Sequence, residues 1–77
     1  MAVYAVRRAE FAIEDQQLVA VEVSDGKIEL YQVDPADGIE IWAGYVSNPS
    51  IPAIARIGAV EALARVPRRE PDRVHRW

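Results

Sequence analysis

Residues able to do chemistry are few in this chain. Cysteine and threonine are absent, and the 77 residues hold one histidine, His75, and one lysine, Lys27. The three serines, Ser24, Ser47 and Ser50, occupy positions typical of turns and helix caps, and no catalytic triad can be built around them. We therefore expect a protein that is not an enzyme, with His75 belonging to a C-terminal tail rather than to a catalytic site.

Cation and phosphate sites have equally little support. Asp34, Asp37 and Glu40 are close together in the sequence, but they lack the alternating oxygen ligands and the glycine position of a calcium loop. Turn chemistry accounts for the two aspartates. The four glycines are scattered singly, so no phosphate-binding loop is formed. We expect no metal and no cofactor.

The length and composition limit the architecture. A chain of 77 residues has room for one domain, and a core of this size is marginal unless something such as oligomerisation supports it. Without cysteine there are no disulfides and no thiolate metal sites. Residues 1–11 lack the apolar region of a signal peptide, and no run approaches the roughly 18 apolar residues of a membrane span. We expect a soluble, cytoplasmic protein with no membrane contact.

The charge is distributed unevenly along the chain. Up to residue 64 there are four basic residues against ten acidic ones, a net charge of −6. From residue 65 onward there are five arginines against two acids, a net charge of +3. We therefore divide the chain into an acidic domain of residues 1–66 and a basic tail of residues 67–77.

Residues 51–66 are predicted to form a helix. Alanine, leucine, arginine and glutamate dominate this segment, Ser50 can cap its start, Pro52 falls in the first turn, and Pro67 stops it. The small residues Ala55, Gly58, Ala59 and Ala62 share one side, which would let the helix lie close against a sheet.

The large apolar residues of this helix recur every three positions rather than every 3.6. At about 100° per residue, each step of three slips back by about 60°, so these side chains point in different directions and one sheet cannot cover them all. Burial by a second subunit and burial within one chain both remain open. We predict self-association, as a homodimer, through Ile54, Ile57, Val60 and Leu63.

Two strands, residues 18–23 and 27–33, are joined by Asp25 and Gly26, the two-residue signal for a type I′ hairpin. That turn places Val21 opposite Leu30, and it puts Val19, Val21 and Val23 on the face covered by the helix. Leu18, Ala20 and Glu22 then fall on the outer face.

A third strand follows a Pro-led turn at residues 34–38. If the loop is residues 35–38, the helix-side residues are Ile39, Ile41, Ala43 and Tyr45, and the outward residues are Glu40, Trp42 and Val46. A loop one residue longer would reverse this assignment. Gly44 marks a bulge or a close approach. Residues 1–13 are predicted to add one or two strands, with a helix over residues 8–16 as the alternative. The fold class is thus α+β, a three- or four-stranded antiparallel sheet packed against one C-terminal helix, with a short basic tail.

The outer face of this sheet is the predicted partner-binding site. Aromatic side chains with a charged rim are typical of protein interfaces, and the residues concerned are Glu22, Glu29, Tyr31, Glu40 and Trp42. The alternative is that the N-terminal segment folds over this face and makes it a second core.

The tail offers a different kind of contact. Its arginines could bind phosphates, and its last residue is aromatic; the residues concerned are Arg68, Arg69, Arg73, Arg76 and Trp77. Nucleic acid ranks below protein as a partner, because a strand crossing the sheet face would meet three glutamates.

The chain resembles the small phage-encoded inhibitor proteins of the anti-CRISPR kind. The resemblance is one of architecture and composition, carried by the segments LVAVEVSDGKIELYQV and IEIWAGYV with an Ala-rich closing helix. It implies masking of a functional surface of a larger complex, often one that binds nucleic acid, with Glu22, Glu29 and Glu40 occupying positions meant for phosphate.

We therefore expect a small non-catalytic protein that acts by stoichiometric protein–protein interaction, and the resemblance implies that it acts as an inhibitor. Two alternatives remain open. One is a nucleic-acid-binding or regulatory protein that uses its Arg-rich tail, and the other is a structural subunit of a larger assembly.

Overall fold

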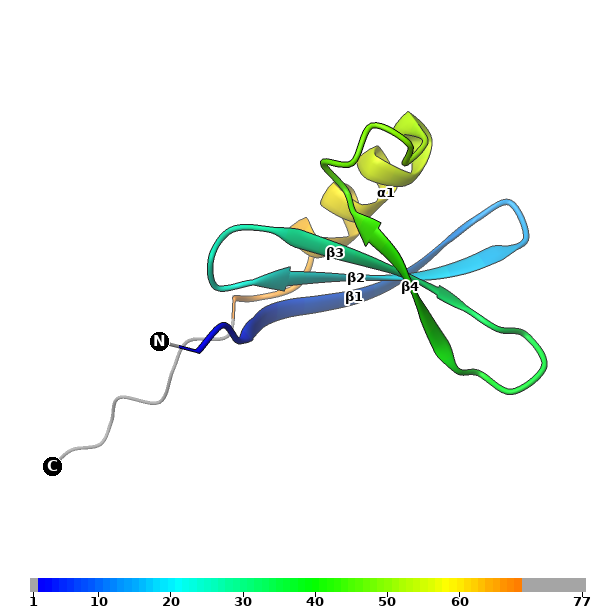
Figure 1. The fold of residues 1–77 in the computed structure, drawn as a ribbon, viewed down its shortest axis with the longest axis horizontal. Helices are drawn as coiled ribbons and strands as arrows, with labels where there is room; N and C mark the ends of the chain where they lie inside the picture. The colour runs from blue at the N-terminus through cyan, green and yellow to red at the C-terminus, as the bar shows by residue number, and fades with distance from the viewer. Residues whose placement is uncertain (1, 69–77) are drawn as a thin grey trace, which may run out of the picture.

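A computed structural model describes residues 2–68 and contains four strands and one helix (Figure 1). In chain order these are β1 (Ala5–Ile13), β2 (Gln16–Val23), β3 (Ile28–Val33), β4 (Glu40–Tyr45) and α1 (Ala53–Ala64). The strands form one antiparallel sheet in the order β1-β2-β3-β4, with α1 on one side. The predicted α+β fold class is confirmed.

The N-terminal segment is an edge strand. Residues of β1 pair with β2 from Ala5 to Ile13, so the predicted strand is confirmed and the alternative helix over residues 8–16 is wrong. Glu14, with φ of 55°, makes the tight turn into β2. Strand β1 pairs within the sheet, so it does not fold over the outer face as a separate layer, although Val19 and Val23 are buried on that face.

The β2–β3 hairpin differs from its predicted form. The N–H of Gly26 donates to the carbonyl of Val23, and the N–H of Val23 donates to the carbonyl of Lys27, each at 2.9 Å. Within this loop only Gly26 has a positive φ, of 94°, whereas a type I′ turn needs two such residues. The loop is therefore one residue longer, with Ser24, Asp25 and Gly26 between the paired strands.

This extra loop residue shifts the register by one and exchanges the two faces of β2. Glu22 lies opposite Ile28 and Ala20 opposite Leu30, so Leu18, Ala20 and Glu22 face α1. The prediction that the valines of β2 face the helix is wrong. They lie on the other side of the sheet, which we call the open face because no element among residues 2–68 is layered on it.

A bulge in β4 changes the faces a second time. Leu30 lies opposite Gly44 and Tyr31 opposite Trp42, which leaves Ala43 as an extra residue, and Gly44 has a φ of 120°. The predicted bulge at Gly44 is thus confirmed, as is the placement of Trp42 on the open face.

Beyond the bulge, the predicted alternation is wrong. Val46 is buried in the core under α1, and Tyr45 stacks on Trp42. The residues before the bulge, Ile39 and Ile41, stay on the α1 side of the sheet but are 58% and 50% exposed, because α1 packs along β1 and β2 rather than over β4.

Helix α1 presents its small residues to the sheet, as predicted. Ala55, Ala59 and Ala62 are buried, and a Cβ added to Gly58 would lie 2.9 Å from Cε2 of Phe11. The helix begins at Ala53 with Pro52 at the N-cap position and no side-chain cap. Ser50 is therefore not the cap.

Replacing Gly58 by valine tests this close approach. The added carbons must displace the Phe11 ring, and overpacking of this kind costs about 2 kcal/mol. The matched control is Ala64→Val on the exposed side of the same helix, which costs about 0.5 kcal/mol through helix propensity alone. Urea unfolding of both variants measures the difference. A Gly58→Val protein as stable as Ala64→Val would contradict the packing described.

Candidate functional site

Three aromatic side chains form a continuous row on the open face. The ring centroids of Tyr31 and Trp42 lie 5.7 Å apart with an interplanar angle of 75°, and those of Trp42 and Tyr45 lie 5.1 Å apart at 87°. Both pairs have the edge-to-face geometry that aromatic rings prefer. We call Tyr31, Trp42 and Tyr45 the aromatic face. Tyr31 and Trp42, both predicted to lie on the outer face, are direct neighbours across β3 and β4.

Trp42 is the most accessible member of this row, with 50% of its surface exposed. Tyr31 is half-buried, and its hydroxyl donates a hydrogen bond to Oε1 of Glu29 at 2.7 Å. This hydrogen bond, followed by burial and by the negative charges nearby, raises the pKa of Tyr31 above its ordinary value. The tyrosine is therefore a neutral donor at physiological pH, and its ring is fixed in orientation.

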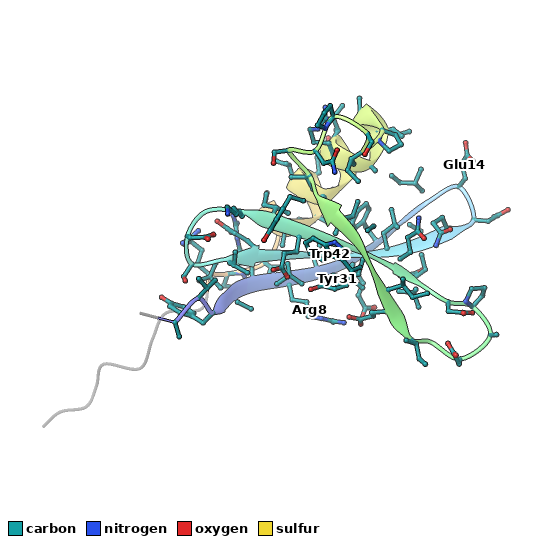
Figure 2. All side chains as sticks on the ribbon, in the orientation of Figure 1. Arg8, Glu14, Tyr31 and Trp42 are labelled. Carbon is teal, nitrogen blue, oxygen red and sulfur yellow. The ribbon has the colours of Figure 1, made fainter. Side chains whose placement is uncertain are left out.

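Charged side chains surround the aromatic face. The Nζ atom of Lys27 lies 5.2 Å from the centre of the Tyr45 ring, within the range of a cation–π contact. Arg8 on β1 forms an ion pair with Glu40 at the start of β4, so it joins the two edge strands of the sheet. Figure 2 shows Arg8, Tyr31 and Trp42 near one another on the side of the sheet away from α1.

The Arg8–Glu40 ion pair reveals how strongly the sheet curls. Four strands spaced about 4.8 Å apart would put the outer two beyond the reach of these side chains if the sheet were flat. Beneath this face Val19 is only 1% exposed although no helix covers it. The curl, the ion pair and the aromatic rings thus close a small apolar layer on the open face.

Glu22 does not belong to this site. It lies on the α1 side of the sheet, where Arg7 and Arg68 both donate hydrogen bonds to its carboxylate, and Arg7 also donates to the carbonyl of Leu63 at 3.0 Å. Burial raises the pKa of Glu22, but the hydrogen bonds and charges of the two arginines outweigh it and hold that pKa below the ordinary value of a glutamate.

The predicted group of three outward glutamates is therefore not formed. Glu22 is on the opposite face and Glu40 is paired with Arg8, so Glu29 alone stands beside the aromatic row without a basic partner among residues 2–68. The sequence interpretation also missed Arg8 and Tyr45. The position of Tyr45 on the open face could have been predicted from Gly44, because a bulge at Gly44 reverses the face on which each following residue of the strand lies.

A second apolar surface lies on the outer side of α1. Ile54, Ile57 and Val60 are 60%, 56% and 51% exposed, and we call these three residues the helix stripe. A groove beside the stripe is lined by Phe11 and Ile13 of β1. Leu63, which was predicted to act with the stripe in self-association, is 1% exposed and packs in the core, so it cannot take part without unfolding.

The described part of the tail has a structural contact. Arg68 pairs with Glu22 at 2.7 Å and so is engaged within the chain. The other predicted tail residues lie outside the described residues: Arg69, Arg73, Arg76 and Trp77.

Two aspartates stabilise the turn between β3 and β4, as expected from the turn chemistry of the sequence. Asp34 and Asp37 each accept a main-chain N–H two residues on, from Ala36 and Ile39 respectively. Across residues 2–68 no three acidic, histidine or cysteine side chains gather as a metal site, and no helix there is long and apolar enough to cross a membrane.

Comparisons of the chain with protein-family models, with curated proteins and with solved structures find no match. The geometry of the two exposed surfaces is therefore the basis for assigning a function.

Replacing Glu22 by glutamine tests the arginine cluster. At pH 7 we expect a loss of about 2 kcal/mol in the free energy of unfolding, because charge-assisted hydrogen bonds from two arginines are lost. The control is Glu10→Gln, which removes an exposed ion pair to Arg8 and should cost less than about 0.5 kcal/mol.

The pH dependence of this loss has a definite sign. Because the folded pKa of Glu22 lies below its unfolded pKa, its stabilisation is present above the unfolded value and disappears as the pH falls through the folded one. Urea unfolding at a series of pH values should show the difference between wild type and Glu22→Gln shrinking as the pH falls below the ordinary pKa of a glutamate. A loss in the free energy of unfolding that stays the same at every acidic pH at which the protein is folded would refute the arginine cluster.

Proposed function

We propose that the protein acts by stoichiometric binding of another protein, and that the aromatic face is the binding surface. The observation that carries this proposal is Trp42, half-exposed between two tyrosines on a face that no element among residues 2–68 covers. Tryptophan and tyrosine are the side chains that most often dominate the energy of protein interfaces.

The site is organised before a partner arrives. Trp42 is held edge-to-face by Tyr31 and Tyr45, and Tyr31 is fixed in turn by Glu29. All three rings stand on paired strands rather than on a loop. Little side-chain entropy is therefore lost on binding, which favours affinity.

The charges favour a basic partner surface. The described residues hold ten acids against six bases, a net charge of −4. Glu29 lies beside the rings, and the exposed Trp42 indole offers a cation–π surface. An arginine-bearing protein segment fits this combination of an aromatic ring and a nearby carboxylate.

The resemblance also implied that glutamates of this protein occupy positions meant for phosphate. The geometry supports this phosphate mimicry less well than it supports binding through the aromatic face. Such mimicry requires a group of unpaired carboxylates, and only Glu29 of the three predicted ones meets that condition among residues 2–68. We therefore propose recognition by aromatic and mixed polar contacts, with inhibition as one outcome of occupying the partner's surface.

The helix stripe favours a second candidate function, a structural subunit of a larger assembly. Three aliphatic side chains, each at least half exposed on one helix face, would be buried in such an assembly. The two candidates use different surfaces, so single substitutions can separate them.

Substitution of Trp42 by alanine tests the proposal. A partner would first be captured from cells of the source and then titrated against the purified protein by calorimetry. We expect one partner site per chain, with binding weakened at least about tenfold by Trp42→Ala because a buried tryptophan anchor is lost.

The matched control is Ile57→Ser on the helix stripe, which should leave the affinity unchanged. If Trp42→Ala, shown to be folded by circular dichroism, binds as tightly as wild type, the aromatic face is not the binding surface. If Ile57→Ser abolishes binding instead, the assembly candidate takes its place.

A further inference from the structure

The outer edge of β4 carries main-chain groups without partners among residues 2–68. The N–H of Asp34 donates to the carbonyl of Ile39 at 2.9 Å, so this pair is hydrogen-bonded. Bonded and non-bonded pairs alternate along an antiparallel ladder, and the next pairs are Val33 with Glu40, Gln32 with Ile41 and Tyr31 with Trp42. Glu40 and Trp42 therefore direct their N–H and C=O groups away from β3, toward the edge.

The side chains of this edge are apolar and exposed. Ile39, Ile41 and Trp42 are 58%, 50% and 50% exposed. Glu40 is the one charged residue of β4, and Arg8 of the same chain neutralises it. An exposed apolar edge strand of this kind is a template for pairing with another strand.

The opposite edge of the sheet is protected. Strand β1 carries charged residues and a register shift at its start, between Ala5 and Arg7, and α1 packs along it. Charges, bulges and covering helices are the usual ways of blocking strand addition. The two edges thus differ in chemistry, and β4 is the one that suits an added strand.

We propose that a second copy of this chain adds to β4 in antiparallel orientation, with Ile41 on the two-fold axis. In this register Glu40 of each copy pairs with Trp42 of the other, and these are the residues whose main-chain groups face outward. Four main-chain hydrogen bonds form, two for each pair. Ile41 meets Ile41 of the second copy as a non-bonded pair, in which side chains approach most closely.

The neighbouring symmetric registers are less favourable. Moving the axis to Glu40 places two glutamates directly opposite each other, which is destabilising. Moving it to Trp42 brings Glu40 opposite Gly44, where the bulge interrupts the ladder. A register shifted by an odd number of residues would place main-chain groups that point toward the edge opposite residues whose main-chain groups point toward β3. The register centred on Ile41 avoids all three faults.

The size of the contact predicts a weak dimer. A standard interface covers about 800 Å² on each partner, whereas a short edge pairing with three half-exposed apolar side chains on each copy covers less. We therefore expect a dimer that dissociates within the micromolar to millimolar range. This contact differs from the sequence-based expectation, which placed self-association on α1.

The dimer would enlarge the proposed binding surface. Pairing at β4 joins the two open faces into one sheet, and Trp42 of each copy comes within about one diagonal neighbour distance of the other, roughly 7–8 Å between Cα atoms. Two aromatic faces then form one two-fold surface of six rings. This last step rests on the proposed function, whereas the dimer itself does not.

Light scattering of the full chain from about 1 µM to 1 mM tests the proposal, with four variants for comparison. Ile41→Lys places two lysines at the axis, and Glu40→Pro removes an outward N–H without removing a bond to β3. Glu40→Ala is the control for Glu40→Pro, because it loses the same ion pair but keeps the N–H. Ile57→Lys is the control for Ile41→Lys, because it places the same charge on the helix stripe.

We expect the wild-type mass to rise from one chain to two, with the dissociation constant raised at least tenfold by Ile41→Lys and Glu40→Pro and changed less than threefold by the two controls. A wild-type protein that remains one chain at 1 mM would overturn the proposal. So would a dimer that is dissociated by Ile57→Lys but not by Ile41→Lys, or equally by Glu40→Pro and Glu40→Ala.

Amide exchange of the wild-type protein gives a test that does not depend on the folding of any variant. The amides of Glu40 and Trp42 should exchange more slowly as concentration rises, and unchanged rates would overturn the proposal. The two proposals fail separately. If the protein is a monomer and its binding to the partner still requires Trp42, only the dimer is refuted. If the protein is a dimer and Trp42→Ala does not weaken its binding to the partner, only the proposed function is refuted.

Discussion

The close approach of α1 to the sheet is the constraint on which the rest of this structure depends. Ala20 of the sheet and Ala59 of the helix are both fully buried, and Gly58 lies against Phe11 with no space for a Cβ. Because small residues fill most of this interface, Leu63 is the one large aliphatic side chain of α1 that packs beneath the helix, and the three residues of the helix stripe have no room there. They lie on the outer side instead, which is why a domain this small exposes so many apolar side chains.

Two arginines hold the helix at this distance, one near each end. Near its start, Arg56 donates to the carbonyls of Val46 and Ile51, which fixes the connection from β4. At its end, Arg7 bridges the carbonyl of Leu63 and the carboxylate of Glu22. Terminal carbonyls of helices need such partners. The helix is thereby placed along β1 and β2, and the far edge of the sheet stays uncovered.

The fold class, the helix and the outward position of Trp42 could be predicted from the sequence, because each rests on strong local signals: the Ala-rich segment between two prolines, the Pro- and Gly-bearing turns, and Gly44. The register of the β2–β3 hairpin could not. Asp25 and Gly26 suit both a two-residue and a three-residue loop, and β2 is apolar on both faces from Leu18 to Val21. No polar alternation was available to decide between them.

The one-residue difference in the length of the β2–β3 loop decided which side chains lie at the predicted site. Side chains alternate between the two faces of a strand, so an error of one residue in the register placed Glu22 on the open face in the prediction. On that face it could not have met Arg7 and Arg68. The contact of Arg7 with Glu22 and Leu63 joins residues far apart in the chain, which no local pattern encodes. Leu63 was misplaced for a related reason, since a three-residue spacing does not tell which of the six directions the sheet occupies.

The most direct measurement is a methyl NOE spectrum of the protein in solution. We predict cross-peaks from the methyl group of Ala20 to protons of α1, and from the methyl groups of Val19 to the ring of Tyr31, its neighbour across the strands. Cross-peaks from Val19 and Val21 to α1, with Ala20 directed toward Tyr31, would contradict it, because they would restore the shorter hairpin and return Glu22 to the open face.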